Sequence, residues 1–178
     1  MRIITGKYKG RHFDIPRSFK ARPTTDFAKE NIFNVLNHYV DLNEATALDL
    51  FSGTGSITLE LLSRGCSQVI SIEQDRDHHR FICDCLKKLD IGATECLPLR
   101  ADAFRFIKNC RQQFDLIFAD PPYAMKELPQ IPHLVLSRNM LKEGGVLVFE
   151  HGKDNDFSLH PHFIEHRQYG SVNFSIFR

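Results

Sequence analysis

Short apolar runs alternate with segments of helical periodicity through most of the chain. The apolar runs occupy residues 47–51, 68–73, 97–102, 114–120 and 146–152, and apolar side chains recur at helical spacing near residues 55–64, 76–89, 103–112 and 133–141. This alternation is typical of right-handed βαβ units, in which helices cover both faces of a mostly parallel sheet. We therefore predict an α/β fold, and ligands in such sheets bind beyond the carboxyl ends of the strands.

Other patterns flank this central region. Residues 1–16 alternate apolar and polar side chains around Gly6-Lys-Tyr-Lys-Gly10, which predicts a β-hairpin, and the spacing after Pro23 predicts a helix over about residues 24–39. Residues 162–170 and 171–178 predict a closing antiparallel pair. We expect one domain over residues 1–178, with a basic hairpin at residues 1–22 and a core at residues 23–178.

Charge is distributed unevenly along the chain. Residues 1–22 hold seven lysines and arginines against one aspartate, although the whole chain has a net charge of +1. A basic segment favours a polyanionic partner, but charge alone is equally compatible with a solvated hairpin that has no partner. The basic residues that we single out as candidates to bind nucleic acid are Lys7, Lys9, Arg11 and Arg22.

Composition excludes several classes of protein. No stretch approaches the roughly 20 apolar residues that a membrane-spanning helix needs, and no secretory signal pattern follows Met1, so we expect a cytoplasmic protein without membrane contact. The five cysteines form no CxxC pair, and His160, His162 and His166 lack a metal-binding spacing. We therefore expect no metal site, and nothing in the sequence indicates an obligate protein partner.

A possible cofactor site lies at the ends of the first three predicted strands. The first strand ends in Asp49-Leu-Phe-Ser-Gly53-Thr-Gly55, where glycines permit a sharp turn, but Thr58 leaves the GxGxxG fingerprint incomplete. Glu73 ends the second strand, where a carboxylate can accept hydrogen bonds from both hydroxyls of a ribose. Asp102 ends the third strand and could accept from an adenine amino group or cap the next helix. Together these residues predict a site for a nucleoside-containing cofactor.

The most specific motif is Asp120-Pro121-Pro122-Tyr123, directly after the apolar run FDLIFA. The amino group of guanine or adenine is a poor nucleophile because its lone pair is delocalised into the ring. The Asp120 carboxylate and the Pro121 carbonyl could each accept a hydrogen bond from this group and direct its lone pair at a methyl donor. Tyr123 would offer an aromatic face to a base turned out of its stack. A purely structural interpretation is a rigid strand exit, since two prolines commonly end a strand.

Together these motifs resemble the bacterial 16S rRNA guanine-N2 methyltransferase family, a class I S-adenosylmethionine-dependent group. The resemblance covers nearly the whole chain and includes MRIITGKYKGRHFDIP, RPTTD, DLFSGTG, IEQD, ADAF, FDLIFADPPY and YGSVNFSIFR. It implies a seven-stranded sheet of order 3-2-1-4-5-7-6 with strand 7 antiparallel, and either 16S rRNA or the small ribosomal subunit as partner. It also implies a catalytic motif at Asp120–Tyr123 and an Arg22–Thr24 segment beside the cofactor and the RNA. The cofactor-binding residues so implied are Asp49, Phe51, Gly53, Gly55, Glu73, Asp102 and Ala103.

Three other functions share part of this pattern. A protein-glutamine methyltransferase has asparagine in place of Asp120 and usually a separate substrate domain, and a DNA adenine methyltransferase normally needs a target-recognition domain. A non-catalytic RNA-binding module would have no use for Asp120 beside a cofactor loop. The sequence therefore favours the rRNA methyltransferase over all three.

Overall fold

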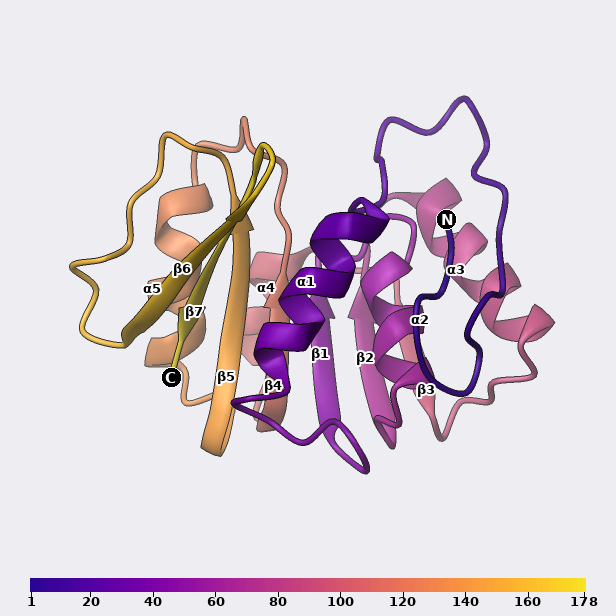
Figure 1. Cartoon of the computed structure of the whole chain (residues 1–178), viewed down its shortest axis with the longest axis horizontal. Helices are drawn as coiled ribbons and strands as arrows, with labels where there is room; N and C mark the ends of the chain where they lie inside the picture. The colour runs from indigo at the N-terminus through magenta and orange to yellow at the C-terminus, as the bar shows by residue number, and fades with distance from the viewer.

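The computed structural model describes residues 1–178 and is built around one seven-stranded sheet (Figure 1). Its strand order β3-β2-β1-β4-β5-β7-β6, with β7 antiparallel to its two neighbours, confirms the predicted topology. The strands are β1 (Thr46–Leu50), β2 (Gln68–Ile72), β3 (Cys96–Leu99), β4 (Phe114–Ala119), β5 (Leu141–His151), β6 (Phe163–Tyr169) and β7 (Val172–Phe177). The helices are α1 (Asp26–Leu36), α2 (Ser56–Ser63), α3 (Arg76–Lys88), α4 (Ala103–Asn109) and α5 (Ile131–Ser137), with a 3-10 turn η1 at Leu128–Gln130.

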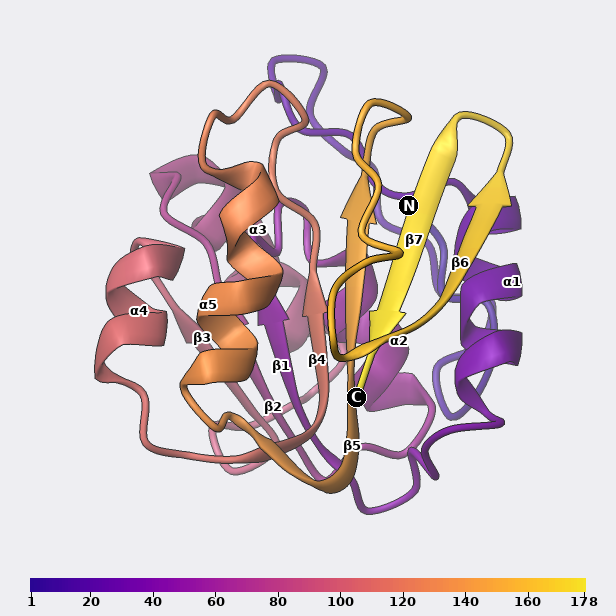
Figure 2. The same ribbon diagram turned by 90° about the vertical axis from the view of Figure 1, so that its left-hand side faces the viewer.

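The helices cover the two faces of the sheet in separate layers. On one face, α1, α2 and α3 pack against alternate strand residues such as Leu116 and Phe118, while α4 and α5 cover Ile117 and Phe149 on the other. Figure 2 shows α4 and α5 on one side of the sheet and α1 on the other. The continuous apolar runs seen in the sequence follow from this arrangement, because a strand buried on both faces has no solvent side. None of the helices is long and apolar enough to cross a membrane.

The register of the central strands determines which residues meet at the carboxyl edge of the sheet. Strand β4 pairs in parallel with β1 on one side, where Leu50 is opposite Ala119, and with β5 on the other, where Ala119 is opposite Phe149. One residue further along each strand, Phe51, Asp120 and Glu150 therefore lie side by side. Strand order also reverses between β1 and β4, which is the position where α/β sheets bind ligands.

The N-terminal segment forms the hairpin predicted over residues 1–16, but with less pairing than its alternating pattern suggests. Its pairing is limited to a single bridge between Arg2 and His12, with backbone hydrogen bonds from Ile3 to Arg11 (3.0 Å) and from Phe13 to Met1 (2.9 Å). The intervening residues turn away to cover α2, and every residue of α2 is buried. At Gly6, with φ at +95°, a Cβ would lie 1.9 Å from the Ser63 carbonyl oxygen, so this close approach requires glycine.

Element boundaries differ from the predicted ones most clearly between α5 and β5. The predicted helix over residues 133–141 ends at Ser137, and β5 begins at Leu141 rather than at residue 146. Asn139 lies between them with φ at +54°, a left-handed conformation that asparagine tolerates and that ends a helix. The predicted helix at residues 24–39 is confirmed as Asp26–Leu36, with Thr25 capping it by accepting from the Ala28 N–H (3.2 Å).

A buried charged cluster joins the N-terminal segment to α1 and α2. The Lys29 ammonium donates to the Arg2 carbonyl (2.7 Å) and lies 3.6 Å from a Glu60 oxygen, and both side chains are almost completely buried. The Glu60 carboxylate also accepts from the backbone N–H groups of Ile4 (2.9 Å) and Thr5 (3.1 Å) and pairs with Arg64 (2.9 Å). Burial lowers the pKa of Lys29, and the nearby Glu60 carboxylate opposes this shift. Glu60 is therefore the shared acceptor that holds the segment on α2.

We expect Glu60→Gln to lower the free energy of unfolding by about 3–5 kcal/mol, because it leaves the buried Lys29 and Arg64 cations without a counter-charge. Lys29→Met should lower it by less, since Glu60 keeps Arg64 and two backbone donors. Urea unfolding of both variants at neutral pH measures the difference. Equal losses for the two variants would contradict the assignment of Glu60 as the central acceptor.

Candidate active site

A cavity of about 790 Å³ opens at the carboxyl ends of β1, β2 and β4. Most of the residues that the sequence singled out line it together, although they come from distant parts of the chain. The exceptions are Gly55, Lys7, Lys9 and Arg11, which do not line the cavity. The predicted site residues that do line it are Arg22, Thr24, Asp49, Phe51, Gly53, Glu73, Asp102, Ala103, Asp120, Pro121, Pro122 and Tyr123.

The turn after β1 adopts left-handed backbone conformations that its sequence must tolerate. Phe51, Gly53 and Gly55 have φ of 60°, 57° and 83°. Gly55 also packs against α3, where an added Cβ would lie 2.9 Å from Ile82 Cγ1, so this glycine supports the turn from behind without facing the cavity. The turn thus brings backbone, rather than side chains, to the cavity wall.

Thr58 explains why the glycine fingerprint is incomplete. Its hydroxyl donates a 2.6 Å hydrogen bond to the Asp49 carboxylate, which is 1% exposed at the end of β1. Burial raises the pKa of Asp49 to about 7, and the charge of Glu73 adds to the shift, whereas the Thr58 hydrogen bond opposes it. A third glycine could not supply this donor. The ionisation of Asp49 is therefore sensitive to any cation that enters the cavity.

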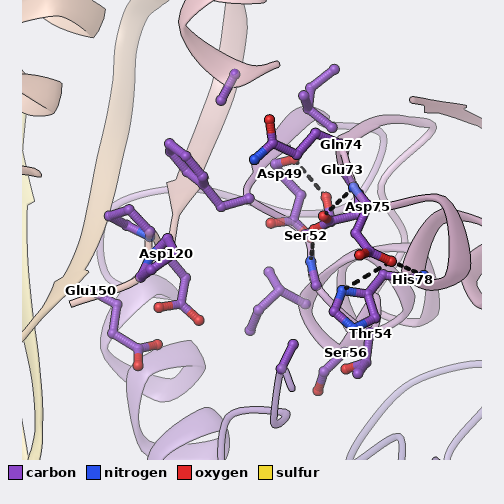
Figure 3. A pocket seen from close by; sticks show the side chains of 18 of the residues that line it. Asp49, Ser52, Thr54, Ser56, Glu73, Gln74, Asp75, His78, Asp120 and Glu150 are labelled. Atoms are coloured by element: carbon purple, nitrogen blue, oxygen red, sulfur yellow. Dashed lines mark hydrogen bonds and ion pairs between the residues drawn. The ribbon is translucent and has the colours of Figure 1, made fainter. Parts of the chain in front are cut away.

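Glu73 and Asp75 follow β2 and have different roles in the structure. One Glu73 oxygen accepts from the Gly53 N–H (2.7 Å) and the other from the Asp75 N–H (2.9 Å), so the carboxylate is fixed against the glycine turn (Figure 3). Asp75 caps α3 by accepting from the Asp77 and His78 N–H groups. Asp102 caps α4 in the same way through the Arg105 N–H (2.9 Å) while still lining the cavity.

The residues after β4 face a second carboxylate. Tyr123 is 45% exposed, and its hydroxyl donates to Glu150 Oε1 at 2.7 Å. Gly152 lets the ring lie against the end of β5, where an added Cβ would be 3.4 Å from Tyr123 Cδ2. Burial, followed by the charges of Glu150 and Asp49, raises the pKa of Asp120 well above its ordinary value. In Figure 3 the Asp120 and Glu150 side chains lie next to each other at one side of the cavity, apart from the Glu73 group.

Residues 17–24 form a strap that crosses from α3 to the Glu150 side of the cavity. Phe19 packs edge-on against His78, with ring centroids 4.6 Å apart, and Thr24 Oγ1 donates to Glu150 Oε2 at 3.4 Å. Lys20 and Arg22 lie between these two contacts and line the cavity mouth, where an Arg22 nitrogen donates to the Phe19 carbonyl. The strap therefore places positive charge at the entrance to an acidic cavity.

The other predicted basic residues lie elsewhere. Lys7, Lys9 and Arg11 are exposed, and the Lys7 N–H donates to the carbonyl of Ser63, the last residue of α2. Ser56, at the first turn of the same helix, lines the cavity. Because a helix rises 1.5 Å per residue, the two ends of α2 are roughly 10 Å apart. These three side chains therefore contribute charge to a neighbouring surface and not to the cavity.

Comparisons with known proteins agree on one family. The family model described as "Conserved hypothetical protein 95" matches residues 1–178. The chain is 32% identical to the "Ribosomal RNA small subunit methyltransferase D" of Haemophilus influenzae over 156 residues, which cover 86% of this chain and 80% of that protein. The chain belongs to this family of S-adenosylmethionine-dependent methyltransferases.

Solved structures show the same fold. A hypothetical protein of Thermus thermophilus superposes with a TM-score of 0.85 at 26% identity, covering 100% of this chain and 99% of that one. The T. thermophilus 16S rRNA N2 G1207 methyltransferase (RsmC), solved with AdoMet and guanosine, has a TM-score of 0.69 at 16% identity. That likeness covers 90% of this chain and 44% of RsmC, and it concerns the fold alone.

The cavity fits the cofactor of this methyltransferase family. S-adenosylmethionine carries a positive sulfonium and an α-ammonium group, and the cavity wall holds Asp49, Glu73, Asp120 and Glu150. A volume of about 790 Å³ is also within the usual range of ligand pockets, which is roughly 300–1,000 Å³. We assign Glu73 to the ribose hydroxyls and Asp102 with Ala103 to the adenine as proposals that this shape and charge support.

Sequence reasoning missed Glu150 and Lys20 as site residues. Glu150 ends the last parallel strand, so the same strand-end rule that selected Glu73 could have selected it. Lys20 was counted only as part of the basic segment, because nothing in its sequence neighbourhood shows that the strap crosses the cavity. Ser52 and Thr54 also line the cavity, and the sequence identified them only as part of the glycine turn.

We expect the affinity for S-adenosylhomocysteine to fall as the pH drops below about 7, by up to about tenfold per pH unit. A ligand with an ammonium group favours ionised Asp49, whose pKa of about 7 means that binding at lower pH must first remove a proton. Above about pH 7 the affinity should level off. Calorimetry from pH 5.5 to 8.5 measures this dependence.

Asp49→Asn should bind more weakly at neutral pH and lose most of the pH dependence. Asp84→Asn, an exposed carboxylate on α3, serves as the matched control and should behave like the unaltered protein. A dissociation constant that does not change with pH in the unaltered protein would remove Asp49 from the cofactor site.

Proposed function

We propose that this protein methylates the exocyclic N2 amino group of a guanine in bacterial 16S rRNA, with S-adenosylmethionine as methyl donor. The observation that carries the proposal is the position of Asp120–Tyr123 at the end of β4, on the wall of the cofactor cavity. Relatives named as methyltransferases of small-subunit rRNA, from Haemophilus influenzae and other bacteria, support rRNA as the substrate class.

The chemistry of the target amine explains the residue types after β4. When bound, the cofactor supplies an electrophilic methyl group on a positively charged sulfur. The Asp120 carboxyl and the Pro121 carbonyl are the acceptors that we assign to the two N–H bonds of the amine, which would favour a pyramidal nitrogen. Proline at residues 121 and 122 restricts the backbone, so these acceptors need little reorganisation on binding. Exclusion of water from the buried end of the cavity strengthens both hydrogen bonds.

Tyr123 supports a substrate that enters as a single unstacked base. Its ring is among the few large apolar side chains that remain exposed, and it lies at the mouth of the cavity. Stacking on an aromatic side chain contributes roughly 1–3 kcal/mol per base and does not depend on sequence. Tyr123 therefore accounts for binding a flipped base, while selection of guanine depends on contacts to its edge.

Product analysis tests this proposal directly. We expect labelled S-adenosylmethionine and unmethylated small subunits or 16S rRNA to yield N2-methylguanosine after digestion to nucleosides, and DNA to yield no labelled base. Asp120→Ala should lower the single-turnover rate by about 10²–10³-fold, because a preorganised acceptor is removed. Its melting temperature and its affinity for S-adenosylhomocysteine should stay close to those of the unaltered protein.

N6-methyladenine in DNA, or an Asp120→Ala enzyme with unaltered turnover, would contradict the proposal. A loss of rate in step with a loss of thermal stability would instead favour the structural interpretation of the two prolines.

Two basic surfaces should contribute separately to RNA affinity. We expect the triple replacement of Lys7, Lys9 and Arg11 by alanine, and the double replacement of Lys20 and Arg22, each to weaken RNA binding. Each variant should lower the slope of log K against log salt by about 0.7–0.9 for every RNA phosphate that the protein no longer neutralises. The triple variant should keep its affinity for S-adenosylhomocysteine, because its residues lie outside the cavity.

The matched control for the salt experiment is the double replacement of Lys108 and Arg111, two exposed basic residues at the end of α4. It removes similar charge from another part of the surface. A control that changes the slope as much as the other variants would mean that only overall charge matters.

A further inference from the structure

Glu150 is a nearly buried carboxylate for which the proposed function has no role so far. It is 5% exposed at the end of β5, and none of the ion pairs in the structure involves it. A buried carboxylate without a cation is costly, and its presence in a cavity is a reason to look for a function.

The register of the sheet places Glu150 beside Asp120. Ala119 pairs with Phe149, so the next residue on each strand lies at the same level, and both side chains face the cavity (Figure 3). The negative charge of Glu150 raises the pKa of the Asp120 carboxyl, so the two groups interact directly. Two carboxylates this close cannot both ionise easily, so they hold a proton at a pH where isolated carboxyls have lost it.

Two hydroxyl donors distinguish the members of the pair. Glu150 accepts from Tyr123 on one oxygen (2.7 Å) and from Thr24 on the other (3.4 Å). No hydrogen bond from a hydroxyl or backbone donor reaches the Asp120 carboxyl. Burial raises the pKa of both carboxyls, but the hydroxyl donors oppose the rise at Glu150, whereas the neighbouring charges of Glu150 and Asp49 add to the rise at Asp120. The arrangement therefore favours an ionised Glu150 and a proton held on Asp120.

We propose that Glu150 is a positioning residue that makes Asp120 a stronger base, so that Asp120 takes up the proton released by the methylated amine. This inference rests on the proposed function, because it concerns the same reaction at the same amino group. It adds a route for the proton, which the hydrogen-bond role of Asp120 alone leaves open.

The proton transfer balances without any further reactant. Methylation leaves the nitrogen with a positive charge and two hydrogens. One N–H bond then breaks, its electron pair returns to nitrogen, and an O–H bond forms on Asp120. Product release exposes the carboxyl pair to water, to which the proton passes before the next turnover. Because Asp120 must be ionised to accept this proton, the rate should rise with pH along the ionisation of Asp120.

The groups that face the pair from the surrounding elements are one carboxyl and two hydroxyls. They are Asp49 at the end of β1, the Tyr123 hydroxyl after β4 and the Thr24 hydroxyl of the strap, and no lysine, arginine or histidine makes an ion pair with Glu150 or Asp120. Neighbouring His151 is hydrogen-bonded to Ser175 of β7 at 2.8 Å. Replacement of Glu150 by a neutral side chain therefore removes the nearest negative charge from Asp120.

We expect Glu150→Gln to lower the titration midpoint of the Asp120 carboxyl by about one pH unit or more. Carbon-13 NMR of aspartate carboxyls in the ligand-free protein measures this midpoint, with Asp120→Asn to assign the signal. Glu143→Gln is the matched control, since it makes the same substitution at an exposed position of the same strand. The control should leave the Asp120 midpoint unchanged.

The pH dependence of single-turnover methyl transfer provides the second measurement. In Glu150→Gln, the pH range over which the methyl-transfer rate rises should shift to lower pH by a similar amount. The maximal rate at high pH should fall by roughly tenfold, because a weaker base accepts the proton. A merely structural role of Glu150 would lower the maximal rate and the melting temperature without shifting the pH range over which the rate rises.

Tyr123→Phe keeps the inference testable if Glu150→Gln fails to fold. It removes one hydroxyl donor from Glu150 and should shift the Asp120 midpoint in the same direction by a smaller amount. An Asp120 midpoint that neither variant moves would overturn the inference, and methyl transfer with an unaltered product would then leave the proposed function intact. Absence of methyl transfer to any RNA would instead overturn the proposed function, while the NMR titration would still decide whether the pair exists.

Discussion

The parallel pairing of β4 with both β1 and β5 is the constraint on which the site depends. Its register brings the residues that follow each strand to one level, so that Phe51, Asp120 and Glu150 become neighbours although they are far apart in the sequence. A shift of one residue in either pairing would turn these side chains away from the cavity. The buried apolar faces of the three strands fix that register, and in this sense the core determines the chemistry.

The cavity is a locally unfavourable arrangement within an otherwise consistent fold. The charges of Glu150 and Asp49 raise the pKa of Asp120, the charge of Glu73 raises that of Asp49, and no basic side chain forms an ion pair with Asp49, Asp120 or Glu150. In contrast, the buried Glu60 carboxylate has two cations and two backbone donors. Buried carboxyls without a cationic partner are typical of functional sites, where stability is given up for activity. A positively charged ligand would relieve the repulsion, which is consistent with the cofactor of the family.

Much of the fold and of the site could be predicted because strand-end residues follow directly from the apolar runs. Glu73, Asp102 and Asp120 each end such a run, Asp49 lies within the first one, and all four line the cavity. The pairing of the N-terminal hairpin is shorter than its sequence pattern suggests, because the backbone donors of Ile4 and Thr5 are taken by Glu60, a residue more than fifty positions away. For the same reason the charge pattern could not separate Lys20 at the cavity mouth from Lys7, Lys9 and Arg11 at the far end of α2, whereas the family resemblance already placed Arg22 beside the cofactor. Local patterns report local structure, whereas these contacts depend on tertiary packing.

The most direct test of the account is a crystal structure of the protein with S-adenosylhomocysteine and guanosine. We predict that the guanine ring stacks on Tyr123 and that its N2 atom lies within about 3.2 Å of both an Asp120 carboxyl oxygen and the Pro121 carbonyl oxygen. The thioether sulfur should lie off the plane of the guanine ring, on the side of N2 to which its lone pair points, toward the glycine turn after β1. A guanosine bound with its amino group directed away from Asp120, in a complex whose cofactor cavity is filled, would contradict the central claim.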